Sequence, residues 1–535
     1  MRVCVSYKPY PMKDDLFYYM KEKSRLCENP EWDLLFDAEC VKMEHRKQQE
    51  VTEMAVLENL EPKRVFYYFE ELTKIPHGSG NTKAISDYLA DFAKEKGLRC
   101  IQDKSNNVVI FKEASKGYEN APTVMLQGHM DMVCEKKPES NHDFTKDPLR
   151  LGIDGDFIYA EDTTLGGDDG IAVAYALAIL EDNTLQHPAL EVVITVDEEI
   201  GLLGAAALDT APLKAKYLLN LDSEEEGYLW AGCAGGMTAV SKLPVKYQEC
   251  TEKKWKITVS GLMGGHSGAE IDKNRANATI LLARFLHEGK EKAEYALAEL
   301  CGGQKDNAIP RKAEALVLAG EEDGKTLCAY AESFTETLRK EYTGSDEGIT
   351  VTVEAAGEGT EPVLHPVSQE KVLFFLLHYP NGIQKMCGFI ENLVETSCNL
   401  GVTCLTPEAL YGTASVRSSV GSAKQALADK IAYLTEFLGG SFDTEGDYPA
   451  WEYCQDSALR PVMVEVFKEM YGKDPEVKVI HAGLECGLFY EKIPGLDCVS
   501  LGPDMESIHT TEEKLSISSV ERVWKYLLEV LKRIK

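Results

Sequence analysis

From about residue 56 onward, segments with continuous runs of hydrophobic residues alternate with segments whose hydrophobic residues recur at helical spacing. Continuous apolar runs such as LEVVITV at 190–196 and KYLLNL at 216–221 predict buried strands. The segment NTKAISDYLADFAKEKGL at 81–98 has its apolar residues at helical spacing, whereas DGIAVAYALAILED at 169–182 is apolar on all sides and predicts a buried helix. Buried strands alternating with helices indicate an α/β fold with a mainly parallel central sheet covered on both faces.

The pattern changes after residue 237 and changes back near residue 449. Between these points, KWKITVS predicts a strand and RANATILLARFLHEGK a helix, in the style of an α+β unit. We therefore predict one domain built from residues 54–237 and 449–535 and interrupted by a smaller α+β domain at 238–448. Residues 1–53 are charged and weakly patterned, so we expect either an extension of uncertain order or a segment that precedes the natural start at Met54.

The C-terminal segment predicts a helix with a defined start and one apolar face. Ser518 and Glu521 have the spacing of a capping box, in which each side chain bonds to the backbone of the other residue. Helical spacing predicts that its buried face consists of Val520, Val523, Trp524, Leu527, Leu528 and Leu531.

The net charge narrows the classes of partner. The 535 residues include 57 basic and 88 acidic side chains, a formal net charge of −31. Nucleic acids and anionic membrane surfaces are bound through a basic face, so we expect neither as a partner. Fifteen cysteines lack any C-x-x-C pair, the first residues lack the apolar stretch of a signal peptide, and no apolar run could span a bilayer. These features predict a cytoplasmic protein with reduced thiols.

Ionisable side chains gather where the predicted strands end. In an α/β sheet, ligands bind at the carboxyl ends of the strands. The side chains at or just after such ends are His129, Asp131, Asp168, Asp169, Glu198, Glu199, Asp222 and His509.

Taken singly, each of these residues has an ordinary structural explanation. A lone histidine after a strand is more often a structural residue than a ligand. Asp168 and Asp169 could simply favour the positive end of the helix that follows them, and Glu224, Glu225 and Glu226 are expected to be solvated charge. Taken together, however, several acids and two histidines at one sheet edge would repel one another without a cation. Mixed imidazole and carboxylate ligands suit zinc, or else cobalt or manganese, and two such ions can share a bridging carboxylate.

Seven motifs give the chain a family resemblance. LQGHMDMV, GGDDGIAVA, TVDEEIGLLGA, NLDSEE, GGHSGAEIDKNRANA, VRSSV and HAGLECGLF, in this order, resemble the two-zinc metallopeptidases of the aminoacylhistidine dipeptidase family, also called cytosolic Xaa-His dipeptidases or bacterial carnosinases. The similarity extends from about residue 56 to the C-terminus. It implies a two-zinc exopeptidase-like catalytic domain and a lid domain through which a homodimer forms.

The resemblance also implies the metal ligands. His129 and Asp222 would bind one ion, Glu199 and His509 the other, and Asp168 would bridge them. Each ion would then have three protein ligands and an open position, as catalytic zinc does. The family's cis peptide after the bridging aspartate would lie between Asp168 and Asp169, where this chain has Asp instead of the usual Asn.

The remaining roles follow from the same resemblance. Asp131 would accept the free imidazole N–H of His129, and Glu198 would be the general base toward a hydroxide shared by the two metals. His266 of the second domain would stabilise the oxyanion. Arg417 would hold the substrate carboxylate, and Gly483 would offer backbone contacts beside it.

Three functions remain open at this stage. The first is a dipeptidase for short peptides with a free amino end, with Xaa-His preference implied by the family. The second is a related amide hydrolase, either an N-acyl amino acid deacylase or a tripeptide aminopeptidase, because the same metal site serves these reactions. The third is a non-catalytic relative, which the presence of all seven first-site groups disfavours.

Overall fold

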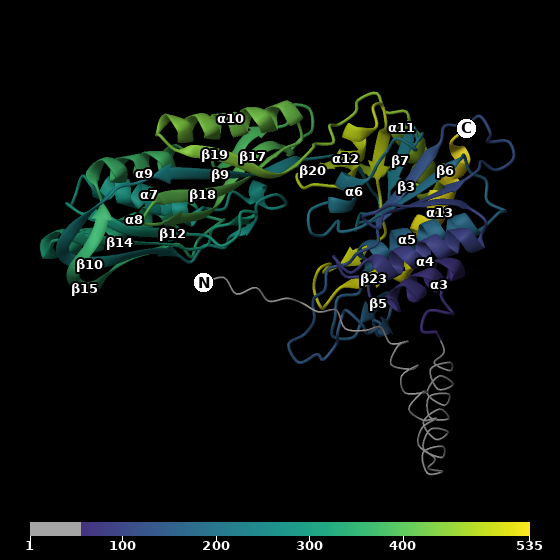
Figure 1. The fold of residues 1–535 in the computed structure, drawn as a ribbon, viewed down its shortest axis with the longest axis horizontal. Coiled ribbons are helices and arrows are strands. Elements are labelled where there is room, and N and C mark those ends of the chain that lie inside the picture. The colour runs from purple at the N-terminus through teal and green to yellow at the C-terminus, as the bar shows by residue number, and fades with distance from the viewer. Residues whose placement is uncertain (1–54) are drawn as a thin grey trace, which may run out of the picture. The chain divides into compact units, whose positions relative to one another are not determined.

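The computed structural model describes residues 55–535, and residues 59–535 form one compact unit. The predicted extension at residues 1–53 therefore lies outside the described part of the chain. Within the described part, two large sheets are built from different stretches of sequence (Figure 1).

The first sheet has its parallel strands at the centre. Its order is β1 (Arg99–Gln102), β2 (Val108–Lys112), β6 (Leu190–Thr195), β3 (Val124–His129), β7 (Tyr217–Asn220), β21 (Asp497–Ser500), β8 (Tyr228–Cys233) and β20 (Glu476–Ile480). The pairs β6–β3, β3–β7, β7–β21 and β8–β20 are parallel, whereas β1–β2, β2–β6 and β21–β8 are antiparallel. The prediction of a mainly parallel α/β sheet is thus confirmed for the central strands that carry the site.

Helices cover both faces of this sheet. They are α3 (Lys63–Thr73), α4 (Lys83–Glu95), α5 (Gly167–Glu181), α6 (Leu203–Ala207), α11 (Leu459–Tyr471), α12 (Glu485–Lys492) and α13 (Ile517–Arg533). Side chains alternate between the two faces along a strand. Met125 of β3 belongs to a core shared with α6 and α12, whereas Gly128 faces α5, where an added Cβ would lie 2.7 Å from the Cβ of Ala172. As predicted, α5 is buried along almost its whole length.

A small antiparallel sheet lies beside the first. Its order is β22 (Met505–Glu506), β23 (Lys514–Ser516), β5 (Phe157–Ala160) and β4 (Leu151–Asp154). It joins the segment before α5 to the segment before α13.

The second large sheet is antiparallel. Its order is β15 (Thr350–Leu364), β10 (Tyr247–Ser260), β14 (Ala313–Ala319), β12 (Ala296–Gly302), β17 (Val394–Leu405), β18 (Ala409–Ser418), β9 (Gly235–Pro244) and β19 (Ser441–Tyr448), and β16 (Gly382–Met386) also pairs with β17. The helices α7 (Ala278–Gly289), α8 (Glu321–Glu341), α9 (Pro366–His378) and α10 (Gly421–Phe437) pack on it. A separate apolar core fills the space between them.

The C-terminal helix begins two residues earlier than its sequence suggests. Its N-cap is Ser516, whose side chain accepts the backbone N–H of Ser519 at 3.3 Å. Ser518 instead donates its hydroxyl to Asp156 at 2.6 Å, so the predicted capping box of Ser518 and Glu521 is wrong. Asp156 is remote in sequence, and only the fold brings it to this helix.

The buried face of α13 is also shifted slightly. Val520, Val523, Leu527 and Leu531 are buried as predicted, whereas Trp524 and Leu528 are half-buried, and Tyr526 and Val530 are buried instead. The Tyr526 hydroxyl donates to the carbonyl of Met463 on α11 at 2.8 Å, which explains how a polar ring can face the core.

Glu226 corrects a second prediction, because it is not simply solvated. Its carboxylate accepts from the guanidinium of Arg522 at 2.6 and 2.8 Å and from the hydroxyl of Ser519 at 2.8 Å. This charge-assisted pair attaches α13 to the segment after β7.

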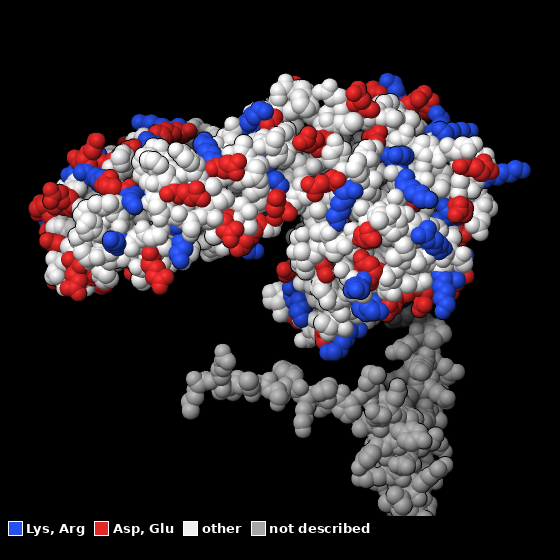
Figure 2. Space-filling model, turned by 45° about the horizontal axis from the view of Figure 1, so that its top comes forward, with Lys and Arg blue, Asp and Glu red and all other residues white. Residues whose placement is uncertain are grey.

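Acidic and basic side chains are interspersed over the face of the molecule in Figure 2. Within residues 55–535, no helix combines the length and apolar character needed to cross a membrane.

Replacing the observed cap tests the corrected start of α13. Ser516→Ala should lower the free energy of unfolding by about 1 kcal/mol, because a backbone N–H loses its acceptor. Denaturant unfolding measures this difference.

Glu521→Ala is the matched control. Glu521 pairs with Lys525 on the exposed side of the helix, so its loss should change the free energy of unfolding by less than about 0.5 kcal/mol. A larger cost for Glu521→Ala than for Ser516→Ala would restore the capping box predicted from sequence.

Candidate metal centre

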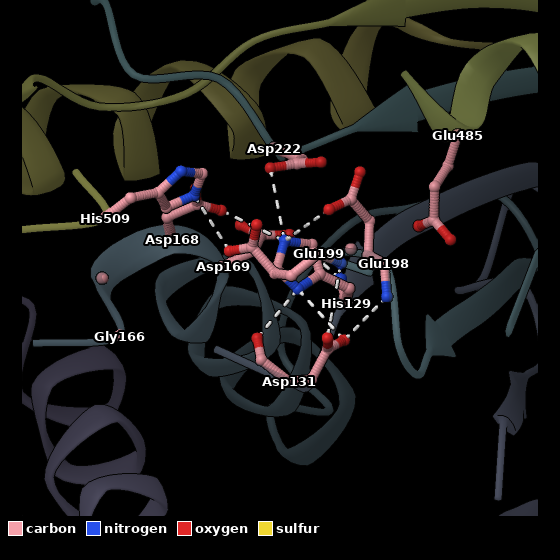
Figure 3. Close-up of polar contacts among 12 residues, drawn as sticks. His129, Asp131, Gly166, Asp168, Asp169, Glu198, Glu199, Asp222, Glu485 and His509 are labelled. Carbon is pink, nitrogen blue, oxygen red and sulfur yellow. Dashed lines mark hydrogen bonds and ion pairs between the residues drawn. The ribbon is translucent and has the colours of Figure 1, made fainter. Parts of the chain in front are cut away.

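The ionisable side chains of the site lie close together (Figure 3), and most of them come from the carboxyl ends of three neighbouring parallel strands. His129 ends β3, Glu198 and Glu199 follow β6, and Asp222 follows β7. Because β6, β3 and β7 are adjacent and parallel, their carboxyl ends meet.

Asp168 and His509 reach the same place from outside the sheet. Asp168 lies in the first turn of α5, and His509 lies in the loop between β22 and β23. The structure thus brings together all five residues that the resemblance implied as metal ligands.

The carboxylate of Asp168 lies between the two histidines. Its Oδ1 is 3.1 Å from Nε2 of His129, and its Oδ2 is 3.1 Å from Nε2 of His509. Each histidine has a second carboxylate nearby: Asp222 Oδ1 is 3.7 Å from His129, and Glu199 Oε1 is 3.0 Å from His509. Potential ligand atoms of His129, Asp168 and Asp222 lie within 4.8 Å of one another, as do those of Asp168, Glu199 and His509. This is the arrangement of two adjoining sites with one shared carboxylate.

The electrostatics of the cluster favour cations. Burial raises the pKa of Glu198 to about 8, and the charges of Glu485, Glu199 and Asp168 add to this. Burial and the neighbouring Asp169 raise the pKa of Asp222 as well. Burial and then mutual repulsion thus favour the protonated forms of these two carboxyl groups. Divalent cations would replace these protons, so the donor set fits the metals that the sequence indicates.

The histidines respond to the same crowding. Hydrogen bonds to Asp168 and Glu199 raise the pKa of His509 to about 10. Burial opposes ionisation of Asp168, but its bonds to His129 and His509 outweigh burial and hold its pKa well below the usual range.

Asp131 fixes more of the site than was predicted. Its carboxylate accepts the backbone N–H groups of Glu198 at 3.1 Å and Glu199 at 3.4 Å, and the hydroxyl of Ser79 at 2.8 Å. Nδ1 of His129 lies 2.9 Å from the backbone carbonyl of Asp131 and 3.5 Å from its carboxylate. The main-chain oxygen is therefore the nearer acceptor for the imidazole N–H, because the carboxylate is turned toward the loop after β6.

Asp169 is hydrogen-bonded to the backbone of His129. The peptide bond between Asp168 and Asp169 is cis, as the resemblance implied. The carboxylate of Asp169 accepts the backbone N–H of His129 at 3.1 Å. A Cβ on Gly128 would lie 2.3 Å from this carboxylate, so the close approach requires glycine.

Sequence reasoning missed Glu485, which lies in a buried polar layer beneath the ligands. Its Oε2 accepts from Gln127 Nε2 at 2.5 Å and from Thr195 Oγ1 at 2.6 Å. Gln127 accepts in turn from Asn220 at 2.6 Å. Gln127 and Asn220 each precede a predicted ligand by two residues, so this layer ties β3, β6 and β7 together just below the site. The available signal was one acid among the small and apolar residues of HAGLECGLF.

Glu513 was missed as well. Its buried carboxylate accepts the backbone N–H groups of Leu165 at 2.8 Å, Gly166 at 3.2 Å and Gly167 at 2.8 Å. The loop that carries His509 therefore also holds the turn that leads into Asp168. In sequence, Glu513 is one of two adjacent acids and looks like solvated charge.

The three predicted substrate residues form a second group. An added Cβ on Gly268 would lie 3.0 Å from Cε1 of His266 and 3.3 Å from Nε of Arg417. Arg417 donates to the hydroxyl of Tyr448 at 2.9 Å, and an added Cβ on Gly483 would lie 2.7 Å from the same ring.

A short segment connects the two groups. His481 was not predicted as a site residue; its Nε2 lies 2.7 Å from the hydroxyl of Ser397 on β17. Glu485, four residues later, lies in the polar layer under the metal ligands. Four residues span at most about 14 Å, so the chain itself limits the distance between the groups.

Comparisons with known proteins find relatives that match most of the chain. The chain is 35% identical over 483 residues to the cytosol non-specific dipeptidase of Escherichia coli (strain K12), covering 90% of this chain and 99% of that protein. The crystal structure of the aminoacylhistidine dipeptidase from Vibrio alginolyticus is 34% identical, with a TM-score of 0.84 over 90% of this chain and 98% of that one. Aminopeptidase PepT from Bacillus cereus shares the fold, with 17% identity and a TM-score of 0.51 over 89% of this chain and 99% of that one.

The family model for peptidase family M20/M25/M40 matches residues 125–533, a stretch that contains all five candidate metal ligands. The resemblance drawn from the seven motifs is confirmed by these matches. On this evidence, the chain belongs to peptidase family M20/M25/M40.

Proposed function

We propose that the protein is a metal-dependent dipeptidase that hydrolyses the peptide bond of its substrates. The observation that carries the proposal is the carboxylate of Asp168 between two histidines, with Glu198 beside it. Two of the three similar proteins named above are called dipeptidases, one a cytosol non-specific dipeptidase and the other an aminoacylhistidine dipeptidase. Dipeptide cleavage is common to them, and Xaa-His preference is the narrower hypothesis that the motifs favour.

Two divalent metal ions are proposed as cofactors, with zinc favoured over cobalt or manganese by the mixed imidazole and carboxylate donors. His129 and Asp222 would hold one, Glu199 and His509 the other, and Asp168 both. When bound, the ions would supply Lewis acidity for the scissile carbonyl and the attacking water.

Glu198 is proposed as the general base. Its Oε2 lies 4.0 Å from Nε2 of His129. A carboxylate oxygen of Glu198 also lies within 4.8 Å of potential ligand atoms of His129 and Glu199, but Glu198 is not part of either group that contains Asp168. It would take a proton from the attacking water and pass it to the leaving amine. Asp131 would orient it through its backbone N–H.

His266 is proposed to stabilise the oxyanion, and its tautomer supports this role. Its Nδ1 accepts the backbone N–H groups of Gly268 at 3.2 Å and Ala269 at 3.0 Å, which puts the proton on Nε2. Burial and the positive charge of Arg417 lower the pKa of His266, so the ring is a neutral donor near pH 7.

Arg417 is proposed to bind the substrate carboxylate. Its Nε is buried and has no hydrogen-bond partner among residues 55–535, which leaves a charged donor free for an anion. Gly483 would add backbone contacts at this end. The short segment from His481 to Glu485 would then fix the distance between the carboxylate site and the metals, and so favour dipeptides over longer substrates.

The domain roles are proposals too. Residues 54–237 and 449–535 would form the catalytic domain, and residues 238–448 the lid through which a homodimer forms. The division of the two large sheets between these stretches supports the boundaries. We also propose a cytoplasmic location, following the name of the Escherichia coli relative.

A substrate panel separates the activities that the sequence left open. Purified protein loaded with zinc should hydrolyse Xaa-His and other dipeptides at least about tenfold faster, in kcat/KM, than tripeptides, because Arg417 would meet the free carboxylate at dipeptide distance. N-acetyl amino acids place their carboxylate at the same distance from the scissile amide but have no free amino end, so they separate a dipeptidase from a deacylase. Release of free amino acids measures each rate. Cleavage of N-acetyl amino acids without dipeptide cleavage would show a deacylase instead.

Two adjacent glutamates should differ in metal content. Glu198→Ala should keep both metals and lose about 10²- to 10⁴-fold in kcat, the usual contribution of a general base. Glu199→Ala should lose one metal per chain. Elemental analysis and dipeptide turnover measure the two effects.

Asp197→Asn is the control for this pair. Asp197 accepts the backbone N–H of Gly80 at 2.7 Å, and asparagine keeps that acceptor, so metal content and kcat should stay near wild type. The role given to Glu198 is wrong if Glu198→Ala retains wild-type turnover.

Without its metals, the protein should become less stable as the pH rises. In the metal-free protein the pKa values of Glu198 (about 8), Glu485 (about 7) and His509 (about 10) are all raised. The folded state then binds more protons than the unfolded chain between pH 6 and 8, so its free energy of unfolding decreases as the pH rises. Bound cations replace these protons and should reduce the decrease.

Thermal unfolding with a chelator or with zinc, at pH 6 and pH 8, measures this difference. The chelated protein should lose more in Tm between the two pH values than the zinc-loaded protein. A chelated protein that gains stability toward pH 8 would contradict the electrostatic account of the site.

A further inference from the structure

The second sheet is paired least extensively between β12 and β17. These strands face each other only at Cys301 opposite Cys404 and Gly302 opposite Thr403. By comparison, β10 and β14 stay in register from Lys253 to Val259. The strands β15, β10, β14 and β12 on one side are therefore joined to β17, β18, β9 and β19 on the other through a short stretch of ladder.

Two free cysteines lie directly opposite each other at this joint. Residues opposite each other in an antiparallel pair have Cα atoms about 4.5 or 5.5 Å apart, depending on the type of pair. Both values fall within the Cα separation of disulfides, about 4.4–6.8 Å. Paired residues point to the same face of the sheet, and both Cys301 and Cys404 are exposed. Elsewhere in the sheet, Cys250 lies opposite Glu361 and Cys398 opposite Val416.

Both thiols are accessible, and charged side chains lie beside Cys301. Across the flanking strands, Cys301 lies opposite Glu314, and Cys404 lies opposite Tyr411. Glu314 forms ion pairs with Lys256 at 2.7 Å and Lys312 at 3.0 Å. Partial burial and then the charge of Glu314 raise the pKa of the Cys301 thiol. Because the thiolate is the form that attacks a disulfide, thiol–disulfide exchange at Cys301 is slow at neutral pH.

We propose that Cys301 and Cys404 are a redox-reactive dithiol that low-molecular-weight disulfides convert to a cross-strand disulfide. One thiolate attacks the small disulfide, forms a mixed disulfide and releases one small thiol. The second thiolate then displaces the other small thiol and closes the protein disulfide. The protein loses two electrons and two protons, and both appear in the two small thiols released.

The product would fasten the sheet where its pairing is shortest. A disulfide between segments far apart in sequence limits the freedom of the unfolded chain and so stabilises the fold. Neither cysteine belongs to the metal centre or to the group around Arg417, so this inference stands apart from the proposed function. In a reducing compartment the bond would be reversible, as expected of a redox-responsive site.

The test is equilibration of the full-length protein with oxidised glutathione, followed by alkylation of the remaining thiols. Peptide mass spectrometry without reduction should find Cys301 joined to Cys404 within one chain. The Tm of the oxidised protein should rise by several degrees and return to the starting value with dithiothreitol. The same treatment of Cys301→Ser should leave glutathione on Cys404 and no rise in Tm.

Cys250→Ser serves as the matched control, since its cysteine also lies on a strand of this sheet but faces no other cysteine. It should form the disulfide and show the rise in Tm like the wild type. Full alkylation of both thiols after equilibration would overturn the proposal. So would glutathione on both cysteines without a link, or a link between two chains.

Discussion

The shared carboxylate of Asp168 is the constraint on which the site depends. Each of its two oxygens lies beside a different histidine, and each histidine has a further carboxylate nearby. In a buried place such a group is stable only when positive charge is present, because like charges repel strongly where water is excluded. Burial and the neighbouring carboxylates raise the pKa values of Glu198 and Asp222 in the metal-free cluster, which reflects the same need for cations.

A second set of polar residues holds these groups together. The layer formed by Glu485, Gln127 and Thr195 fixes the strands just below their ends. Glu513 ties the loop of His509 to the turn before Asp168, and Asp131 holds the loop after β6. Each makes hydrogen bonds to backbone or amide groups that would otherwise be buried without partners, so the ligand geometry is fixed before any metal binds.

The connecting chain limits the distance between the candidate metal ligands and the group around Arg417. The segment from His481 to Glu485 contacts Ser397 at one end and Gln127 at the other. Because this segment is short, the group around Arg417 and the candidate metal ligands cannot be far apart.

By itself, the sequence determined which residues could serve as ligands and on which elements they lie. Periodicity located β6, β7 and α5, because side-chain spacing depends on local backbone geometry. The fold decided the contacts between residues far apart in the chain: Ser516 as the cap of α13, the pairing of Glu226 with Arg522, and the buried position of Glu485. It also turned the carboxylate of Asp131 from the imidazole toward the loop after β6. An acid's sequence neighbours do not reveal whether water or a distant donor will surround its charge, so these roles required the tertiary structure.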